Sequence, residues 1–242
     1  PRPVRGPGGR SPSATAGRWN EPRAATATVL TPPRGAGPQV RGGWMSPALP
    51  RVLLARHGQT AWSLSGQHTG LTDLPLTAMG EADARSLAAR LQPQRVARVL
   101  CSPLQRAWKT CKLAGFGTRA EADARLVEWD YGDYEGLTSA QILALQPDWQ
   151  LFRDGCPRGE SPAQVAARAD SLIQTLHSVD GDVLLFSSGH FLRMLAVRWL
   201  GLEPGAGALL GIDTASLGML GYEHRLQQPV IRLWNDTAHV GS

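Results

Sequence analysis

Residues 52–60 read VLLARHGQT, an apolar run that ends abruptly in Arg56, His57 and Gly58. A short apolar run bounded by polar residues is typical of a strand that is buried on both faces. Taken alone, the polar end is best explained as a strand that leaves the core through a solvated arginine and a histidine in the following loop. The remaining sequence decides whether Arg56 and His57 belong to a site.

Apolar runs and helical patterns alternate along the chain from Arg51 onward. The predicted strands are residues 51–55, 97–101 and 182–187, and the predicted helices are residues 79–91, 162–177 and 191–200. This alternation is typical of βαβ units, which build a parallel sheet with helices packed against it. The stretches SLGMLGY and PVIRLW near the C-terminus predict a terminal hairpin. The sequence therefore predicts the α/β class.

Two segments carry the signals of a helix start. They read SPAQ at residues 161–164 and SPLQ at residues 102–105. In each segment, serine suits the N-cap, proline suits the first helical position and glutamine can complete a capping box. The second segment predicts a further helix, whose first amides would lie close to the end of the strand at residues 97–101.

The first 44 residues differ in composition from the rest of the chain. They contain eight Pro, eight Gly and seven Arg, with Glu21 as the single acid. This composition provides little apolar surface to offset the conformational entropy that is lost on ordering. We therefore predict a disordered segment at 1–44 and a folded domain at 45–242. The segment has a formal charge of +6 and the whole chain +5, so residues 45–242 carry −1.

Three interpretations of this basic segment are open: an arm that binds nucleic acid, a transit peptide, or a leader that precedes a native start at Met45. Its arginines are spaced rather than clustered, and only Trp19 and Trp44 could stack on bases. We therefore expect no nucleic-acid partner. No stretch approaches the roughly 20 apolar residues of a spanning helix, so we expect a cytoplasmic protein without membrane association.

The cysteines and histidines do not indicate a metal site. Cys101, Cys111 and Cys156 fit no paired metal spacing, and the six histidines show no HExxH pattern. Free cysteine behaves mainly as a small buried hydrophobe, so we predict reduced, structural cysteines. We expect neither a metal ion nor another cofactor.

Polar residues follow each of the three predicted strands. They are Arg56 and His57 after the first, Ser102 and Arg106 after the second, and Ser187, Ser188, Gly189 and His190 at the end of the third. Ligands of open α/β sheets bind beyond the carboxyl ends of the strands, so we expect these residues to meet in one place. Glu128 follows a short apolar stretch and precedes a glycine-rich turn, and we expect it to join them.

This set of side chains suits phosphoryl transfer. The planar fork of arginine binds phosphoryl oxygens, and two arginines roughly balance the charge of about −1.5 to −2 on a phosphate group. The helix amides after Ser102 can add donors. A neutral imidazole can attack phosphorus and hold the group covalently, while a carboxylic acid can protonate the leaving oxygen and then activate water.

Five motifs carry a resemblance to a known family. They read RHGQT at residues 56–60, TGLTDLPLT at 69–77, SPLQRA at 102–107, EWDYGDYEG at 128–136 and GES at 159–161. From about Arg51 to the C-terminus, the chain resembles the histidine phosphatase superfamily, which includes the cofactor-dependent phosphoglycerate mutases. The wording SGQ.TG and EWDYG.YEG most resembles that of bacterial acid phosphatases and of the fungal sedoheptulose bisphosphatase type.

The resemblance implies a fold and roles for individual residues. The fold is a three-layer α/β sandwich with a mostly parallel central sheet, of the phosphoglycerate mutase type. His57 would be the phosphorylated nucleophile, with Arg56 and Arg106 as phosphoryl ligands and Glu128 as proton donor. His190 completes the catalytic candidates. The candidate substrate contacts are Gln59, Thr60, Ser63, Thr69, Gly70, Tyr131 and Ser188.

One position departs from the pattern of the family. The second family histidine normally stands directly before a glycine near the last core strand, where this chain has Ser188. Several relatives read HGH there, and His190 corresponds to the second histidine of that motif. A serine can donate a hydrogen bond but carries no positive charge, so we expect weaker transition-state stabilisation. The implied outcomes are reduced turnover or a non-catalytic phosphate-binding protein.

The interval between the YG..EG motif and GES distinguishes a phosphatase from a mutase. Mutases that resemble this family carry a longer insertion there, rich in Lys and Arg. In this chain residues 137–158 contain only Arg153 and Arg158 as basic residues. We therefore predict a phosphatase that acts on small phosphomonoesters such as sugar phosphates, with a mutase as the alternative. The expected assembly is a monomer or a homodimer.

Overall fold

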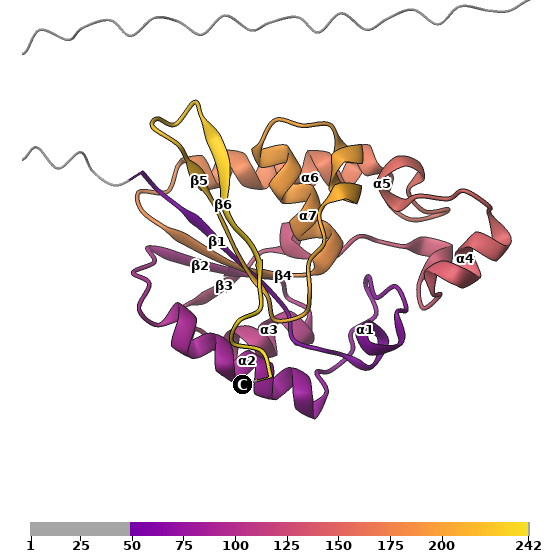
Figure 1. Ribbon diagram of the computed structural model, residues 1–242, viewed down its shortest axis with the longest axis horizontal. Coiled ribbons are helices and arrows are strands. Elements are labelled where there is room, and N and C mark those ends of the chain that lie inside the picture. Colours follow the sequence, from indigo (N-terminus) through magenta and orange to yellow (C-terminus); the bar gives the residue numbers. More distant parts are fainter. Residues whose placement is uncertain (1–48, 242) are drawn as a thin grey trace, which may run out of the picture. The chain divides into compact units, whose positions relative to one another are not determined.

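A six-stranded sheet lies at the centre of residues 49–241, which are the residues that the computed structural model describes (Figure 1). Its order is β3-β2-β4-β1-β5-β6. The strands are β1 (Val52–Arg56), β2 (Arg98–Cys101), β3 (Ala120–Ala122), β4 (Val183–Ser187), β5 (Leu217–Tyr222) and β6 (Pro229–Asp236). Strands β1 to β4 are parallel, whereas β5 pairs antiparallel with β1 and β6. The predicted mostly parallel sheet and terminal hairpin are confirmed. The predictions for residues 1–44 lie outside the described residues.

Helices cover both faces of the sheet. One face carries α2 (Ala78–Leu91) and α3 (Gln105–Leu113), and the other carries α6 (Pro162–His177) and α7 (Gly189–Trp199) (Figure 1). The shorter elements are α1 (Ala61–Ser65), α4 (Ser139–Leu145), α5 (Leu151–Asp154) and the 3-10 helices η1 (Ala124–Leu126), η2 (Gly132–Tyr134) and η3 (Pro204–Leu209). This arrangement is the three-layer sandwich that the sequence predicts.

Alternate residues of β1 pack into two separate cores. Val52 and Leu54 contact the core formed with α6 and α7, whereas Leu53 and Ala55 contact the core formed with α2 and α3. Successive strand residues point to opposite faces, so a strand covered on both faces needs a continuous apolar run. Burying each leucine stabilises the fold by roughly 1.5–3 kcal/mol, so this run anchors the strand that ends in Arg56.

The helix start predicted at residues 161–164 is confirmed. Ser161 is the N-cap of α6 and accepts from the Gln164 N–H, and Pro162 is the first helical residue. The Gln164 side chain accepts in return from the Ser161 N–H, which completes the capping box.

The helix start predicted at residues 102–105 is wrong. Helix α3 begins only at Gln105, and its N-cap residue makes no side-chain cap bond. Instead, the Gln105 N–H donates to Asp73 Oδ1 at 2.8 Å, so a carboxylate from a distant loop caps the helix. The Ser102 hydroxyl accepts only a long bond of 3.4 Å from the Leu104 N–H. The first amide of α3 is therefore engaged by Asp73, and the role of the other amides after Ser102 as phosphate donors stays a prediction.

Candidate active site

The ends of β1 and β4 lie side by side at the carboxyl edge of the sheet. Arg56, the last residue of β1, is in register with Ser187, the last residue of β4. The His57 N–H then donates to the Ser187 carbonyl oxygen at 2.9 Å. These contacts place Arg56 and His57 next to the segment that runs from Ser188 to His190, so the ends of β1 and β4 converge as predicted.

A close backbone contact holds the loop that follows β1. An added Cβ at Gly58 would lie 2.3 Å from the carbonyl oxygen of Gly80 in α2, so only glycine fits at this contact. The Gly58 N–H also donates to Thr110 Oγ1, in α3, at 3.0 Å. Both helices on this face of the sheet thereby fix the position of His57.

The His57 imidazole is buried and has a defined tautomer. Its Nδ1 lies 2.8 Å from the Gly58 carbonyl oxygen, which can only accept, so Nδ1 carries the proton. Burial, followed by the positive charges of Arg106 and Arg56, holds the pKa of His57 well below its usual value. The ring is therefore neutral near pH 7, and Nε2 is left with a free lone pair that can attack an electrophile.

The Arg56 guanidinium lies against the start of α7. One terminal N–H donates to the Ile212 carbonyl oxygen at 2.6 Å, while Nε has no partner among the described residues. An added Cβ at Gly189 would lie 3.2 Å from the Arg56 Cζ, so the absence of a side chain there gives the guanidinium its room. Burial lowers the pKa of Arg56, and the Glu128 carboxylate opposes that shift.

Arg106 is fully buried and binds mainly to backbone. Its terminal nitrogens donate to the carbonyl oxygens of Thr72, Thr69 and Gly70 at 2.9, 3.1 and 2.7 Å. Its Nε is buried and has no partner within the described part of the chain. Arg106 therefore organises the loop at residues 69–72 and adds positive charge beside His57.

Glu128 is buried at the N-terminus of α7. Its Oε1 accepts from the Trp129 and Phe191 amides at 2.9 and 2.7 Å, and its Oε2 accepts from the His190 amide at 2.9 Å. The positive end of the helix dipole favours a carboxylate at this position. The first turn of α7 thus fixes Glu128 in the site.

Ser188 is buried and makes no use of its hydroxyl. It is the N-cap residue of α7, but its side chain makes no cap bond because Glu128 occupies the first amides of the helix. Its Oγ has no partner among residues 49–241. The position at which the resemblance expects a histidine therefore lies beside Gly189 and Arg56, and a neutral, unpaired hydroxyl fills it.

Tyr131 and His190 form a neutral pair. Tyr131 Oη lies 2.5 Å from His190 Nδ1. Burial raises the pKa of Tyr131 well above its usual value and lowers the pKa of His190 well below its usual value. The tyrosine hydroxyl is therefore the donor, and the proton of the imidazole stays on Nε2. The His190 ring also stacks on His68, with ring centroids 5.9 Å apart.

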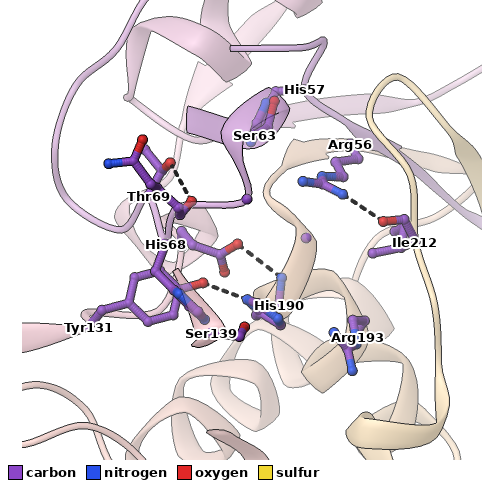
Figure 2. A pocket seen from close by; sticks show the side chains of 14 residues that line it. Arg56, His57, Ser63, His68, Thr69, Tyr131, Ser139, His190, Arg193 and Ile212 are labelled. Atoms are coloured by element: carbon purple, nitrogen blue, oxygen red, sulfur yellow. Dashed lines mark hydrogen bonds between the residues drawn. The ribbon is translucent and has the colours of Figure 1, made fainter. Parts of the chain in front are cut away.

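A cavity of about 220 Å³ opens beside these residues (Figure 2). The predicted site residues that line it are Arg56, His57, Ser63, Thr69, Glu128, Tyr131 and His190. The predicted site residues outside its lining are Gln59, Thr60, Gly70, Arg106 and Ser188. The structure thus brings most of the catalytic candidates together around one cavity.

Three predicted substrate contacts support loops instead of lining the cavity. Gln59 Oε1 accepts from Thr77 Oγ1 at 2.8 Å. Thr60 caps α1. The Gly70 N–H donates to the Glu135 carboxylate at 2.8 Å. These positions differ from the prediction because bonds to other protein groups use their polar atoms.

The cavity also contains residues that the sequence did not single out. They are Gly66, Gln67, His68, Ser139, Arg193 and Ile212. Arg193 follows His190 by three residues on α7, and that helical spacing was an available signal. Ser139 and Ile212 come from α4 and from the loop before β5, and no motif indicated them.

His57 and His190, whose rings are neutral in the folded protein, predict a pH-dependent stability. His57 and His190 both have pKa values well below the usual 6.5, so below pH 6.5 the unfolded chain binds protons that the folded chain does not. We expect the free energy of unfolding to fall as pH drops from about 6.5 to about 5, by up to about 1.4 kcal/mol per pH unit for each histidine. Urea unfolding across this range measures the slope.

Single variants assign that slope to the two rings. His57→Asn and His190→Asn should each remove the contribution of one proton, whereas His224→Asn, at an exposed turn, should leave the slope unchanged. Carboxylates such as Asp123, whose pKa is lowered by Arg125, titrate at lower pH and do not obscure this range. A stability that is constant between pH 6.5 and 5 would contradict the neutral state of both rings.

No group of three or more His, Cys, Asp or Glu in residues 49–241 is placed to hold a metal ion. Within the same residues, no helix has the length and apolar character needed to cross a bilayer. Cys101, Cys111 and Cys156 are free and buried, as predicted.

The model of the histidine phosphatase superfamily (branch 1) matches residues 52–237. The chain belongs to this superfamily. The matched range begins with β1 and ends just after β6, so it includes every element that lines the cavity.

Individual relatives of this histidine phosphatase carry phosphatase names. The chain is 46% identical over 183 residues to an acid phosphatase of Mycobacterium tuberculosis. The matched region covers 74% of this chain and 89% of the relative. It is 37% identical over 185 residues to the sedoheptulose 1,7-bisphosphatase of Saccharomyces cerevisiae. This matched region covers 63% of this chain and 68% of the relative. A relative named as a probable phosphoglycerate mutase, from Yersinia enterocolitica, is 31% identical over 78% of this chain and 94% of its own length.

Solved structures of similar proteins have the same fold. One is the structure of an open reading frame from Mycobacterium tuberculosis, with a TM-score of 0.73 at 42% identity over 77% of this chain and 97% of that chain. Another is a mycobacterial glucosyl-3-phosphoglycerate phosphatase, with a TM-score of 0.67 at 28% identity over 77% of this chain and 98% of that chain. Together with the family, these relatives identify this histidine phosphatase as a phosphoric monoester hydrolase with the predicted phosphoglycerate mutase-like fold.

Proposed function

We propose that this histidine phosphatase hydrolyses small phosphomonoesters, such as sugar phosphates, through a covalent phosphohistidine at His57. The observation that carries the proposal is the state of the His57 ring. Its Nδ1–H donates to the Gly58 carbonyl oxygen, and its pKa is held well below the usual value by burial and by two arginines. A neutral ring with a free Nε2, at the wall of an open cavity, is the nucleophile that such a reaction needs.

The proposed reaction has two displacement steps. Nε2 of His57 attacks phosphorus, so a P–N bond forms while the P–O bond to the leaving group breaks. The leaving oxygen takes a proton from the Glu128 carboxyl group in the cavity wall. The proposal requires Glu128 to be protonated in the substrate complex, whereas the α7 amides stabilise its carboxylate in the free protein. Glu128 then accepts a proton from the water that attacks phosphorus, and phosphate leaves as the P–N bond breaks. The unpartnered Nε atoms of Arg56 and Arg106 are the donors proposed to bind the phosphoryl oxygens.

Ser188 limits the rate in this proposal. A histidine beside Gly189 could place a positive charge next to the phosphoryl group, whereas the Ser188 hydroxyl is neutral. Loss of one well-placed donor in a water-poor site typically costs about 10² to 10³ in rate. We therefore propose a phosphatase of reduced turnover. The unpaired Ser188 Oγ also favours a second candidate function, a phosphate-binding protein without turnover.

A phosphatase explains the chain better than a mutase does. A mutase must protect its phosphohistidine from water and bind a second small acid. The segment at residues 137–158 is short, and its two arginines make contacts elsewhere: Arg153 bonds to Asp154 and Arg158 to Asp133. The segment therefore supplies no free cation over the cavity. A cytoplasmic location, a monomeric or dimeric state and the absence of a nucleic-acid partner remain predictions.

Rapid-quench labelling tests the function directly. The protein is mixed with radiolabelled fructose 1,6-bisphosphate or 3-phosphoglycerate and quenched in alkali, in which a phosphohistidine is stable. We expect a label on His57 that appears within the first turnover and decays as free phosphate is released. Fragmentation of the labelled tryptic peptide in the mass spectrometer identifies the residue, because His57 and His68 both lie in the peptide at residues 57–85.

The same experiment distinguishes the three candidates. A transient label with release of free phosphate supports the phosphatase. A stable label that returns to a second acceptor, with no free phosphate, would support the mutase and contradict the proposal. Binding of both compounds without any label or phosphate release would support the binding protein.

A further inference from the structure

Arg193 lines the cavity, although the proposed reaction gives it no role. It lies on α7, three residues after His190 and four after Gly189, and residues at this spacing share one face of a helix. Figure 2 shows Arg193 near His190 and well separated from His57. Helix α7 therefore presents a second arginine to the cavity, away from the nucleophile.

Two contacts fix the Arg193 guanidinium in place. Its Nε donates to the Gly207 carbonyl oxygen at 2.9 Å, and its Cζ lies 4.6 Å from the centroid of the Phe152 ring. Both partners belong to the scaffold, in η3 and α5. The terminal nitrogens of Arg193 make no hydrogen bond within residues 49–241, so they are held in position and available to a ligand.

The charge of Arg193 is not paired. Among the described residues it forms no ion pair, whereas Arg198, one and a half turns further along α7, is paired with Asp170 at 2.9 Å. Burial lowers the pKa of Arg193 and the Glu128 carboxylate opposes that shift without contacting the guanidinium, and arginine stays protonated at neutral pH. Partly buried charges are normally neutralised by a partner. A cation that is fixed, unpaired and exposed to a cavity indicates an anionic ligand.

We propose that Arg193 binds a second anionic group of the substrate, a phosphate or a carboxylate, while Arg56 and His57 bind the phosphoryl group that is hydrolysed. This inference rests on the proposed phosphatase function and narrows its substrate class to small molecules with anionic groups at two positions. The cavity volume of about 220 Å³ lies below the roughly 300–1,000 Å³ of drug-sized pockets, in agreement with a short carbon skeleton. Arg193 then determines specificity, and His57 performs the chemistry.

Steady-state kinetics of Arg193→Gln tests the assignment. The substrates are fructose 1,6-bisphosphate and 3-phosphoglycerate, which carry two anionic groups, and the two fructose monophosphates, which carry one. We expect the variant to lose at least about tenfold more kcat/KM with the doubly anionic substrates than with the monophosphates, mainly through KM, because a charge-assisted bond is lost. A larger loss with fructose 1,6-bisphosphate identifies the second group as a phosphate. A larger loss with 3-phosphoglycerate identifies it as a carboxylate.

Two further variants make the result specific. Arg198→Gln removes the same charge from the same helix outside the cavity, so the ratio between the two substrate classes should stay at the wild-type value. Arg193→Lys keeps the charge but loses the planar fork, so the ratio of kcat/KM between doubly anionic substrates and monophosphates should fall several-fold. This variant provides the test if Arg193→Gln does not fold. Equal losses for both substrate classes in the Arg193 variants would overturn the proposal.

Binding measurements separate this proposal from the function on which it rests. Calorimetry in the His57→Asn background compares fructose 1,6-bisphosphate with inorganic phosphate, with and without Arg193→Gln. Loss of at least about tenfold in bisphosphate affinity, with a smaller loss for phosphate, supports the role of Arg193 even if the wild-type protein hydrolyses no substrate. In that case only the phosphatase function fails. Equal affinities with and without Arg193 would reject the second anion site.

Discussion

Replacing His57 with asparagine is expected to lower kcat for phosphomonoesters by at least about 10⁴-fold, because the proposed covalent route is lost with its nucleophile. The asparagine amide can still donate to the Gly58 carbonyl oxygen, as Nδ1–H does in the native protein. The loop against Gly80 should therefore keep its position. Initial rates of phosphate release at saturating substrate measure the effect, and the label on the protein should disappear with it.

The controls for this variant concern folding and binding. His224→Asn makes the same chemical change at an exposed residue of the turn between β5 and β6, and it should retain the wild-type rate. Arg56 is unchanged in His57→Asn, so inorganic phosphate should still bind. If His57→Asn kept more than about 1% of the wild-type kcat, a covalent intermediate on His57 would not be the main route.

The fold could be predicted where burial dictates the sequence pattern. Residues 52–55 and 183–186 are strands covered on both faces, so each must be apolar throughout, and each was predicted. Strand β3 (Ala120–Ala122) was not predicted, because it is short and its side chains are largely exposed, so it has no apolar run. Backbone bonds and the ion pair between Arg98 and Glu121 join it to β2. The cap of α3 was missed for a similar reason, since Asp73 reaches it only through tertiary packing.

The site could be predicted where a strand end or a motif places a residue. Arg56 and His57 follow directly from the end of β1, and the topology rule for open sheets brings them to the start of α7. The binding of the Glu128 carboxylate by α7 amides has no such signal, because it joins residues about 62 positions apart. Arg193 has helical spacing from His190, but any arginine on a helix surface can have that spacing, so only the cavity distinguishes it.

Replacing Ser188 with histidine is expected to raise kcat by about 10²- to 10³-fold, because it restores a charged donor beside the phosphoryl group. Ser188 lies directly before Gly189, whose missing side chain gives room to Arg56, so a new imidazole would share the region of that guanidinium. The hydroxyl that it replaces has no partner among the described residues, and no existing bond is lost. Phosphate release and the decay rate of the phosphohistidine label measure the gain.

The size of the new side chain must be separated from its charge. Ser188 is buried, so a larger residue can strain the packing at a cost of about 1–3 kcal/mol, which urea unfolding of each variant measures. Ser188→Asn is the matched control, because asparagine also adds volume and a donor but remains neutral. If the missing charge limits turnover, asparagine should recover less than about a tenth of the gain seen with histidine. A folded Ser188→His protein with an unchanged kcat would contradict the prediction, because turnover would then not be limited by the missing charge at position 188.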